Sequence, residues 1–261
     1  MASSSIKQLV VVRRRSNQTQ REYADHHFQV HGALAGAGKP EESPLVYYLS
    51  RAFDSAYSNA SLAQPAWSGH SGATELYFRD GEHMGRAYGN EYTRSVIGPD
   101  GANFNDFAGA IAMFAKEALI HGSPMQQAEE QRLVALYYIQ AREQVENAVL
   151  AERLEPRVIS AFGSISEQIV ANVALPDPDN KLRYFQGEAA PQYAIAYQLY
   201  LRGKDDIAAF RKAQRVLEDE CRDSIRCETT FVLFVVRSLV FDQEAGIAFS
   251  AARQPDVTSY V

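Results

Sequence analysis

The sequence predicts an α+β protein made of two tandem units with the element order βαββαβ, whose antiparallel sheets pack face to face into one barrel. The same succession of short apolar runs and amphipathic stretches occurs twice in 261 residues, and it starts again after a Gly-Ser-Pro break at residues 122–124. The motif Leu76–Arg79, which precedes one expected helix, recurs in similar form as Leu199–Arg202 before another. We therefore expect a first unit over residues 1–122, a linker over 123–131, and a second, degenerate unit with a C-terminal tail over 132–261.

The first unit opens with a strand and a helix. The apolar run Leu9–Val12 is typical of a strand that is buried on both faces. Thr19 can cap a helix over Gln20–Leu34, because its hydroxyl can accept a hydrogen bond from a free N–H group of the first turn. Gly36 and Gly38 then end this helix.

Two strands, a helix and a last strand complete the first unit. Leu45–Phe53 and Thr74–Phe78 have the apolar content of strands. A helix is expected to begin near Asp80, and Pro99 is expected to close this segment. The apolar run Phe107–Leu119 then predicts the last strand.

The second unit repeats this order. Its expected strands are Leu133–Ile139, Ile165–Leu175, Tyr193–Leu201 and Phe231–Val236, and its expected helices are Arg142–Leu154 and Asp205–Glu220. The clearest loop of this unit is Pro176–Asn180.

All six histidines lie in the first unit, and three of them lie on its first helix. The pair Arg21–Glu22 can be aligned with Arg142–Glu143 of the second unit. In this alignment His26, His27 and His31 are matched by Asn147, Ala148 and Glu152. The second unit is therefore expected to be a structural partner, with the chemistry confined to the first.

Composition excludes several classes of function. The net charge of −6 comes with no long basic run, so we expect neither a nucleic-acid nor a membrane partner. No apolar stretch approaches the about 20 residues that cross a bilayer, which predicts a soluble cytoplasmic protein. The chain has no phosphate-binding glycine loop and no glycine-flanked nucleophilic serine, so nucleotide chemistry and triad hydrolysis are disfavoured and no cofactor is expected.

Histidine is the best candidate for catalysis, because imidazole titrates near neutral pH. His31 is the first choice as general acid or base, with His27 or His26 assisting. The spacing of His27 and His31 could bind a metal, but Phe28 stands where a zincin has its glutamate, so we expect no metal. A purely structural His31, bonded to backbone at a helix end, remains the alternative.

Aromatic and charged side chains on or beside the expected strands could bind a flat, apolar or phenolic ligand inside the barrel. Core packing is the alternative role for the aromatic ones. The candidate substrate-binding residues are Tyr47, Arg51, Trp67, Glu75, Tyr77 and Arg79.

The segment Glu22–Gly32 resembles the EthD family of the dimeric α+β barrel superfamily. Tyr23 and His31 match the family pattern, whereas His26 and His27 replace its aromatic pair. Further similar segments are Thr74–Phe78, Pro99–Asp100, and Phe104 with Asp106. The resemblance implies ferredoxin-like units that pair into a barrel, here as a pseudo-dimer within one chain that keeps one pocket. It also implies kinship with small cofactor-independent enzymes of polyketide and aromatic metabolism, and a catalytic role for His31.

The leading hypothesis is a cofactor-independent lyase or cyclase that decarboxylates, dehydrates or cyclises an aromatic or polyketide-like secondary metabolite. A cofactor-free oxygenase of phenolic substrates is an alternative enzyme, and a non-catalytic binding protein for a hydrophobic metabolite is an alternative of another class. The chain is expected to act as a monomer, which is its own pseudo-dimer, or as a homodimer.

Overall fold

The computed structural model describes residues 5–58, 65–124, 131–143, 145–177, 179–188 and 190–253. Within these residues, eight strands form a closed antiparallel barrel in the order β1-β3-β2-β8-β5-β7-β6-β4. Residues 125–130 of the expected linker, and Pro178 of the expected loop, lie outside the described residues. The strands are β1 (Ile6–Val12), β2 (Val46–Tyr57), β3 (Gly72–Phe78), β4 (Ile111–His121), β5 (Arg132–Ile139), β6 (Ser166–Ala174), β7 (Ile195–Leu201) and β8 (Phe231–Asp242).

The two halves of the chain join edge to edge. The strands of the first half follow the order β4-β1-β3-β2 around the barrel, and those of the second half follow β8-β5-β7-β6. β2 pairs with β8, and β4 pairs with β6, so hydrogen bonds close both seams. The two sheets were expected to pack face to face. In the structure their edge strands also pair with each other, so neither sheet has a free edge.

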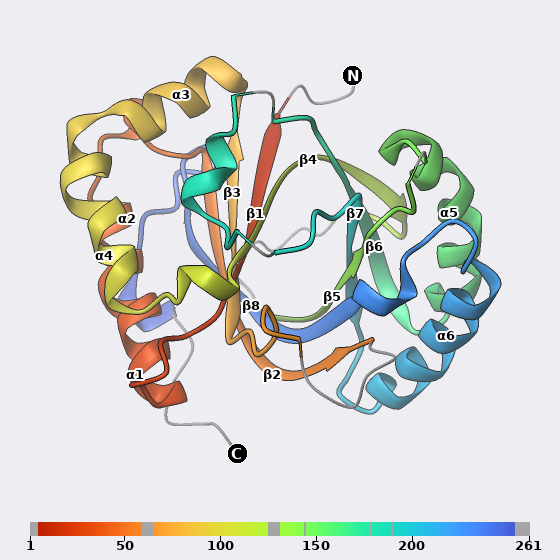
Figure 1. Cartoon of the computed structure of the whole chain (residues 1–261). Helices are drawn as coiled ribbons and strands as arrows, with labels where there is room; N and C mark the ends of the chain where they lie inside the picture. Colours follow the sequence, from red (N-terminus) through yellow and green to blue (C-terminus); the bar gives the residue numbers. More distant parts are fainter. Residues whose placement is uncertain are drawn as a thin grey trace.

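Alternation along each strand separates the barrel interior from the outer face. On β1, Leu9 and Val11 pack inside the barrel with residues of the second half such as Leu136. Val10 and Val12 point outward and pack against Tyr23 and neighbouring helical side chains. The helices accordingly lie outside the barrel in two groups, one over each half (Figure 1).

The first helical stretch begins at the expected residue. The Thr19 hydroxyl accepts a hydrogen bond from the Glu22 N–H at 3.2 Å, and the Glu22 carboxylate accepts one from the Thr19 N–H at 2.7 Å, which makes a capping box. The stretch consists of α1 (Gln20–Asp25), the π-helix η1 (His26–His31) and α2 (Gly32–Gly36). The π geometry in its middle was not predicted.

The second helical stretch is broken into short pieces. Asp80 caps α3 (Gly81–Gly89) by accepting a hydrogen bond from the His83 N–H at 2.8 Å. Pro99 does not close the segment as expected. It lies in the first turn of α4, where a backbone N–H has no partner within the helix, so proline is tolerated there. The remaining pieces are the π-helix η3 (Thr93–Ile97), α4 (Gly98–Asp100), and the 3₁₀ turns η4 (Gly101–Asn103) and η5 (Phe107–Gly109).

The expected start of the second-half helix at Arg142 is wrong. α5 (Asn147–Phe162) begins after the Arg142–Glu143 pair, whereas Arg21–Glu22 lies inside α1. The second-half helix α6 (Asp206–Glu220) agrees with its expected range. Counted from the helix starts, the positions of Tyr23, His27 and His31 are occupied in α5 by Leu150, Leu154 and Val158, which are fully buried.

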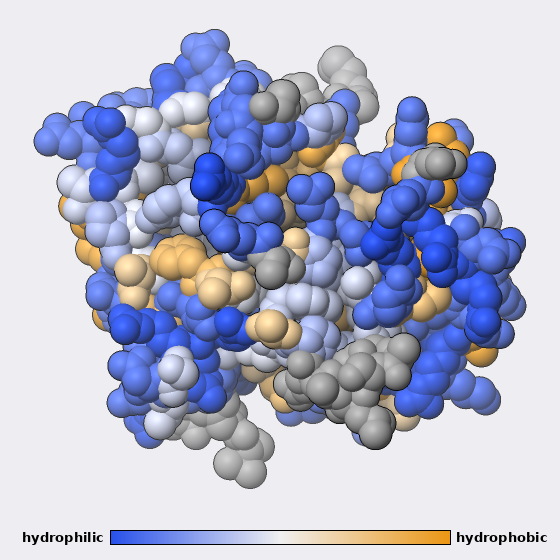
Figure 2. Space-filling model, viewed as in Figure 1, coloured by the Kyte–Doolittle hydropathy of each residue, from blue (hydrophilic) through white to orange (hydrophobic). Residues whose placement is uncertain are grey.

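The surface in Figure 2 is mostly hydrophilic, with a hydrophobic patch on the left beside α4. None of the helices in the described part of the chain is both long enough and apolar enough to span a membrane. Both cysteines, Cys221 and Cys227, are free thiols.

Candidate functional site

A cavity of about 570 Å³ lies between the outer face of the first-half sheet and the first-half helices. Outward side chains of β1 and β3, such as Val10 and Thr74, form its floor, and His27 and His31 line it from η1. The pocket is therefore outside the barrel, not in the interior where we expected it. Its lining is mostly apolar, which suits a flat hydrophobic ligand.

The second half also contributes to this cavity. The segment after β6 crosses to the first-half helices (Figure 1), and its short 3₁₀ helix η6 (Lys181–Tyr184) brings Lys181, Tyr184 and Phe185 to the cavity. The Tyr184 hydroxyl donates a hydrogen bond to the Gly98 carbonyl at 2.9 Å. One pocket is thus built from both halves of the chain.

One carboxylate, Asp100, holds two of the three helix histidines. Its Oδ2 lies 2.8 Å from His31 Nδ1, and its Oδ1 lies 2.8 Å from His26 Nε2. Asn103 also donates to Oδ1, at 2.9 Å. Burial alone would raise the pKa of Asp100, but the hydrogen bonds from His31, Asn103 and His26 hold it well below its usual range. Asp100 is therefore an anion at any ordinary pH.

This anion determines which His31 nitrogen is available for chemistry. An anionic carboxylate accepts hydrogen bonds only, so the nitrogen bonded to it, Nδ1, carries a proton. Neutral His31 then has an unprotonated Nε2, and no described residue forms a hydrogen bond with that atom. Since His31 lines the cavity, its Nε2 can accept a proton from a bound molecule.

The π turn explains why both His26 and His31 reach Asp100. Five residues apart on an α-helix, two side chains differ in direction by about 140°. A π-helix has more residues per turn, because each N–H bonds the carbonyl five residues back, as Gly32 does with His27 here. Residues five apart then lie closer in direction than they do on an α-helix. A regular α-helix would direct one of the two histidines away from the carboxylate.

His27 has a different environment and a different role. Its side chain is buried, with Nδ1 2.9 Å from the Tyr23 hydroxyl and Nε2 3.5 Å from Thr74 Oγ1. The ring stacks on Phe104 with centroids 4.7 Å apart. Burial, helped by the neighbouring His31 and His26, lowers the pKa of His27 well below its usual value. His27 is thus a neutral part of the cavity wall.

The structure places one of the six expected substrate-binding residues in the cavity. This residue is Tyr47, and burial raises the pKa of its hydroxyl. Arg51 is buried but does not line the cavity, and Arg79 is exposed after the end of β3. Trp67 packs against Tyr57 and Phe231, with ring centroids 5.7 and 5.8 Å away.

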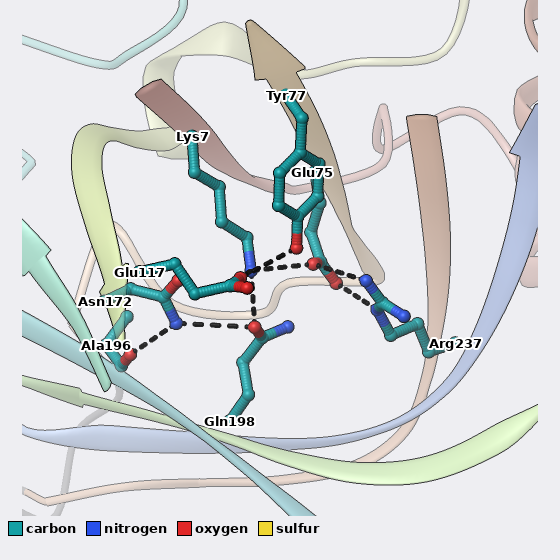
Figure 3. Close-up of polar contacts among 8 residues, drawn as sticks. All are labelled: Lys7, Glu75, Tyr77, Glu117, Asn172, Ala196, Gln198 and Arg237. Carbon is teal, nitrogen blue, oxygen red and sulfur yellow. Dashed lines mark hydrogen bonds and ion pairs between the residues drawn. The ribbon is translucent and has the colours of Figure 1, made fainter. Parts of the chain in front are cut away.

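The other two, Glu75 and Tyr77, are directed into the barrel interior. Thr74 and Leu76 line the cavity, so their neighbours on β3 must point to the opposite face. There Glu75 is paired with Lys7 at 3.0 Å and with Arg237 at 2.8 Å (Figure 3). Tyr77 donates to Glu117 at 2.8 Å, and Glu117 is also 2.7 Å from Lys7. Neither residue can take part in the outer cavity.

Two parts of the site were not predicted from the sequence: the carboxylate of Asp100, and the lining residues that come from the second half. Asp100 and Phe104 belong to segments that resembled the EthD family, so that resemblance contained a signal for them. Lys181, Tyr184 and Phe185 come from the second half and had no such signal. No group of three or more His, Cys, Asp or Glu side chains within the described ranges is arranged to bind a metal ion.

The family model "EthD domain" matches residues 15–108, which confirms the resemblance to the EthD family over this part of the chain. A crystal structure of an anthrone oxidase-like protein is 11% identical, with a TM-score of 0.59 over 92% of this chain and 95% of that chain. A putative monooxygenase from Fusobacterium nucleatum is 8% identical, with a TM-score of 0.54 over 92% and 96%. At these identities the likeness shows the α+β barrel fold alone. No curated protein sequence matches the chain significantly.

Proposed function

We propose that the EthD domain at residues 15–108 is an enzyme active site in which His31 removes a proton from a flat, largely apolar, phenolic or enolisable substrate. The observation that supports this most is the Asp100–His31 pair at the edge of an apolar cavity. In the step, the proton moves from a substrate O–H or acidic C–H to His31 Nε2. The substrate becomes a phenolate or an enolate.

The surroundings of His31 suit a general base. Asp100 holds the ring in one tautomer and stabilises the imidazolium that forms, as the aspartate of a catalytic triad does. His26 and Asn103 occupy the other carboxylate oxygen and so restrain its rotation. His26 does not line the cavity and is best described as a positioning residue.

We propose a lyase or cyclase reaction for the anion. In a dehydration, the enolate expels a hydroxyl group, which takes the proton from His31 and leaves as water. In a cyclisation, the enolate carbon attacks a carbonyl group of the same molecule, and the resulting alkoxide takes that proton. In a decarboxylation, loss of carbon dioxide gives the carbanion, and protonated His31 returns a proton to it. Each reaction needs only the proton that His31 moves.

A cofactor-free oxygenase is the second candidate, and the names of the two fold relatives favour it. Here the carbanion reacts with O₂ as co-substrate. A CH₂ carbon becomes a carbonyl carbon with one oxygen atom, and the second oxygen atom leaves as water. This reaction starts with the same proton removal by His31, so oxygen consumption separates it from the lyase and cyclase reactions.

The test measures proton removal directly. Anthrone is an enolisable aromatic probe whose CH₂ protons exchange in D₂O, and NMR follows this exchange under anaerobic conditions. The native protein is expected to accelerate the exchange, and His31→Ala should lose about 100-fold or more of this acceleration. An oxygen electrode then reports whether O₂ is consumed in air. Equal acceleration by native protein and His31→Ala contradicts the proposal, and tight binding without exchange supports the carrier alternative.

We also propose that the two halves are tandem ferredoxin-like units, so that a single chain is its own pseudo-dimer. The matching strand orders β4-β1-β3-β2 and β8-β5-β7-β6 support this. In the second unit, the helix positions that correspond to Tyr23, His27 and His31 are occupied by buried apolar residues, namely Leu150, Leu154 and Val158. This supports a single active pocket for each chain.

A further inference from the structure

Asn105 has a buried amide that the fold does not use. It lines the cavity, and the residue is only 8% exposed. Its Oδ1 is buried, and no described residue donates a hydrogen bond to it. Buried polar atoms are nearly always hydrogen-bonded in folded proteins, so an exception in a ligand cavity needs an explanation.

The backbone around Asn105 fixes the amide in place. The Asn105 N–H donates to the Gly101 carbonyl at 2.9 Å. On either side of it, the Arg15 N–H donates to the Phe104 carbonyl at 3.1 Å, and the Asp106 N–H donates to the Arg13 carbonyl at 2.7 Å. These bonds join the segment to the chain that follows β1. The backbone of Asn105 is therefore held, and its side chain is kept at the cavity wall.

The same short segment carries the other groups of the site. Asp100 holds His31, and Phe104 packs against both cavity histidines, with ring centroids 4.7 Å from His27 and 4.9 Å from His31. Asn105 follows Phe104 directly. A flat molecule that lies beside these rings is thus within the same cavity as the free amide oxygen.

We infer that Asn105 is a substrate-binding residue whose Oδ1 accepts a hydrogen bond from a hydroxyl group of the substrate. The substrate of this site is therefore a hydroxylated flat molecule, phenolic or enolic, and not a pure hydrocarbon or its ether. A neutral hydroxyl is favoured over an ammonium donor, because the side chains of Arg94 and Lys181 line the same cavity. This inference rests on the proposed function for the identity of the bound molecule as the substrate.

The experiment compares two matched probes, 2-naphthol and 2-methoxynaphthalene, which share a ring system and differ in the ability to donate a hydrogen bond. Dissociation constants are measured for the native protein, Asn105→Leu and the control Gln18→Leu, whose amide donates to the Asn103 carbonyl at 2.9 Å and does not line the cavity. The native protein should prefer 2-naphthol about tenfold, the value for one hydrogen bond whose loss leaves a buried acceptor unpaired. Asn105→Leu should reduce this preference below about twofold, and Gln18→Leu should retain it.

Equal binding of the two probes by the native protein overturns the inference, and so does a preference that survives in Asn105→Leu. Thermal unfolding checks that each variant folds, and Asn105→Ala gives the same readout if the leucine variant does not. His31→Ala separates this inference from the proposed function. Its naphthol preference should persist while proton exchange is lost. If the naphthol preference depends on Asn105 but proton exchange does not depend on His31, the proposed function alone is refuted. If proton exchange depends on His31 but the naphthol preference does not depend on Asn105, the inference alone is refuted.

Discussion

Two imidazoles share one carboxylate in this site, but only one of them lines the cavity. Asp100 contacts His26 and His31 at the same distance of 2.8 Å. In the proposed mechanism the two histidines therefore differ through their position and not through their bond to the carboxylate. His31 can reach a ligand, whereas His26 and Asn103 hold Asp100 in the orientation that His31 needs.

Asp100→Asn should slow proton removal from anthrone by about 10²- to 10⁴-fold, the range reported for general bases and for triad aspartates. The amide keeps the shape but loses the charge that stabilises the imidazolium. The NMR exchange assay measures this rate. Asp106→Asn is the matched control, since Asp106 pairs with Arg13 at 2.6 Å and does not line the cavity. A rate as high in Asp100→Asn as in the control would show that His31 acts without its carboxylate.

Glu75 in the barrel interior should make stability depend on pH. Burial by itself raises the pKa of this carboxyl, but the charges of Arg237 and Lys7 outweigh it and lower the pKa from 4.5 to about 2. A lowered pKa stabilises the fold above the unfolded value near 4.5, and this contribution is lost as the pH falls toward 2. It corresponds to roughly 3 kcal/mol.

Urea denaturation of the native protein and of Glu75→Gln at pH 6 and pH 3 measures this contribution. At pH 6 the variant should be less stable by roughly 3–5 kcal/mol, because it leaves Lys7 and Arg237 with too little negative charge. Its stability should also fall less between the two pH values. Glu82→Gln, which affects an exposed ion pair with Arg86, is the control and should change little. The same loss of stability on acidification in Glu75→Gln and in native protein contradicts the prediction.

At the scale of elements, the first helical stretch combines a predictable start with an unpredicted middle. The cap at Thr19 follows from the local residues, since the Glu at the third helical position completes a capping box. The π turn His26–His31 does not follow from local preferences. It occurs together with the contacts of His26 and His31 with Asp100, about 70 residues further along the chain.

Thr19→Ala should lower the free energy of unfolding by about 1 kcal/mol, because it removes the side-chain acceptor for the Glu22 N–H. Thermal and urea unfolding measure the effect. Thr19→Ser retains the hydroxyl and should keep most of the stability. If the serine and alanine variants lose equal stability, the loss comes from the methyl group and not from the cap.

At the scale of the whole molecule, each half completes the other. β2 and β4 of the first half have their outer edges paired with β8 and β6. The ion network in Figure 3 also spans the halves, since Lys7 and Glu75 meet Gln198 and Arg237 inside the barrel. A separated half would expose two strand edges and an incomplete buried network.

Residues 1–124 expressed alone should therefore not give a folded monomer. Size-exclusion chromatography with light scattering should show self-association or aggregation. Mixing with residues 131–261 during refolding should restore a one-to-one complex. A monomeric fragment with cooperative thermal unfolding would contradict this prediction and would show that the first half is stable without its partner.

The local pattern of residues determined much of this protein by itself. Apolar runs predicted every strand of the barrel to within a few residues at most ends, and the single cluster of histidines pointed to His31 and His27. These properties depend on neighbours in the chain, which the sequence displays directly. The predicted start of α5 is wrong, because Arg142–Glu143 has the same residues as Arg21–Glu22 of α1 but lies before the helix.

Only the tertiary structure decided which face of the sheet carries the site. Alternation shows that Glu75 and Thr74 face opposite sides, but not which side the helices cover, so Glu75 was assigned to the pocket and Thr74 was not. The pairing of Asp100 with His31 and the hydrogen bond of Tyr184 to Gly98 are contacts between distant segments. Such contacts depend on how the barrel closes, and no local pattern of residues encodes them.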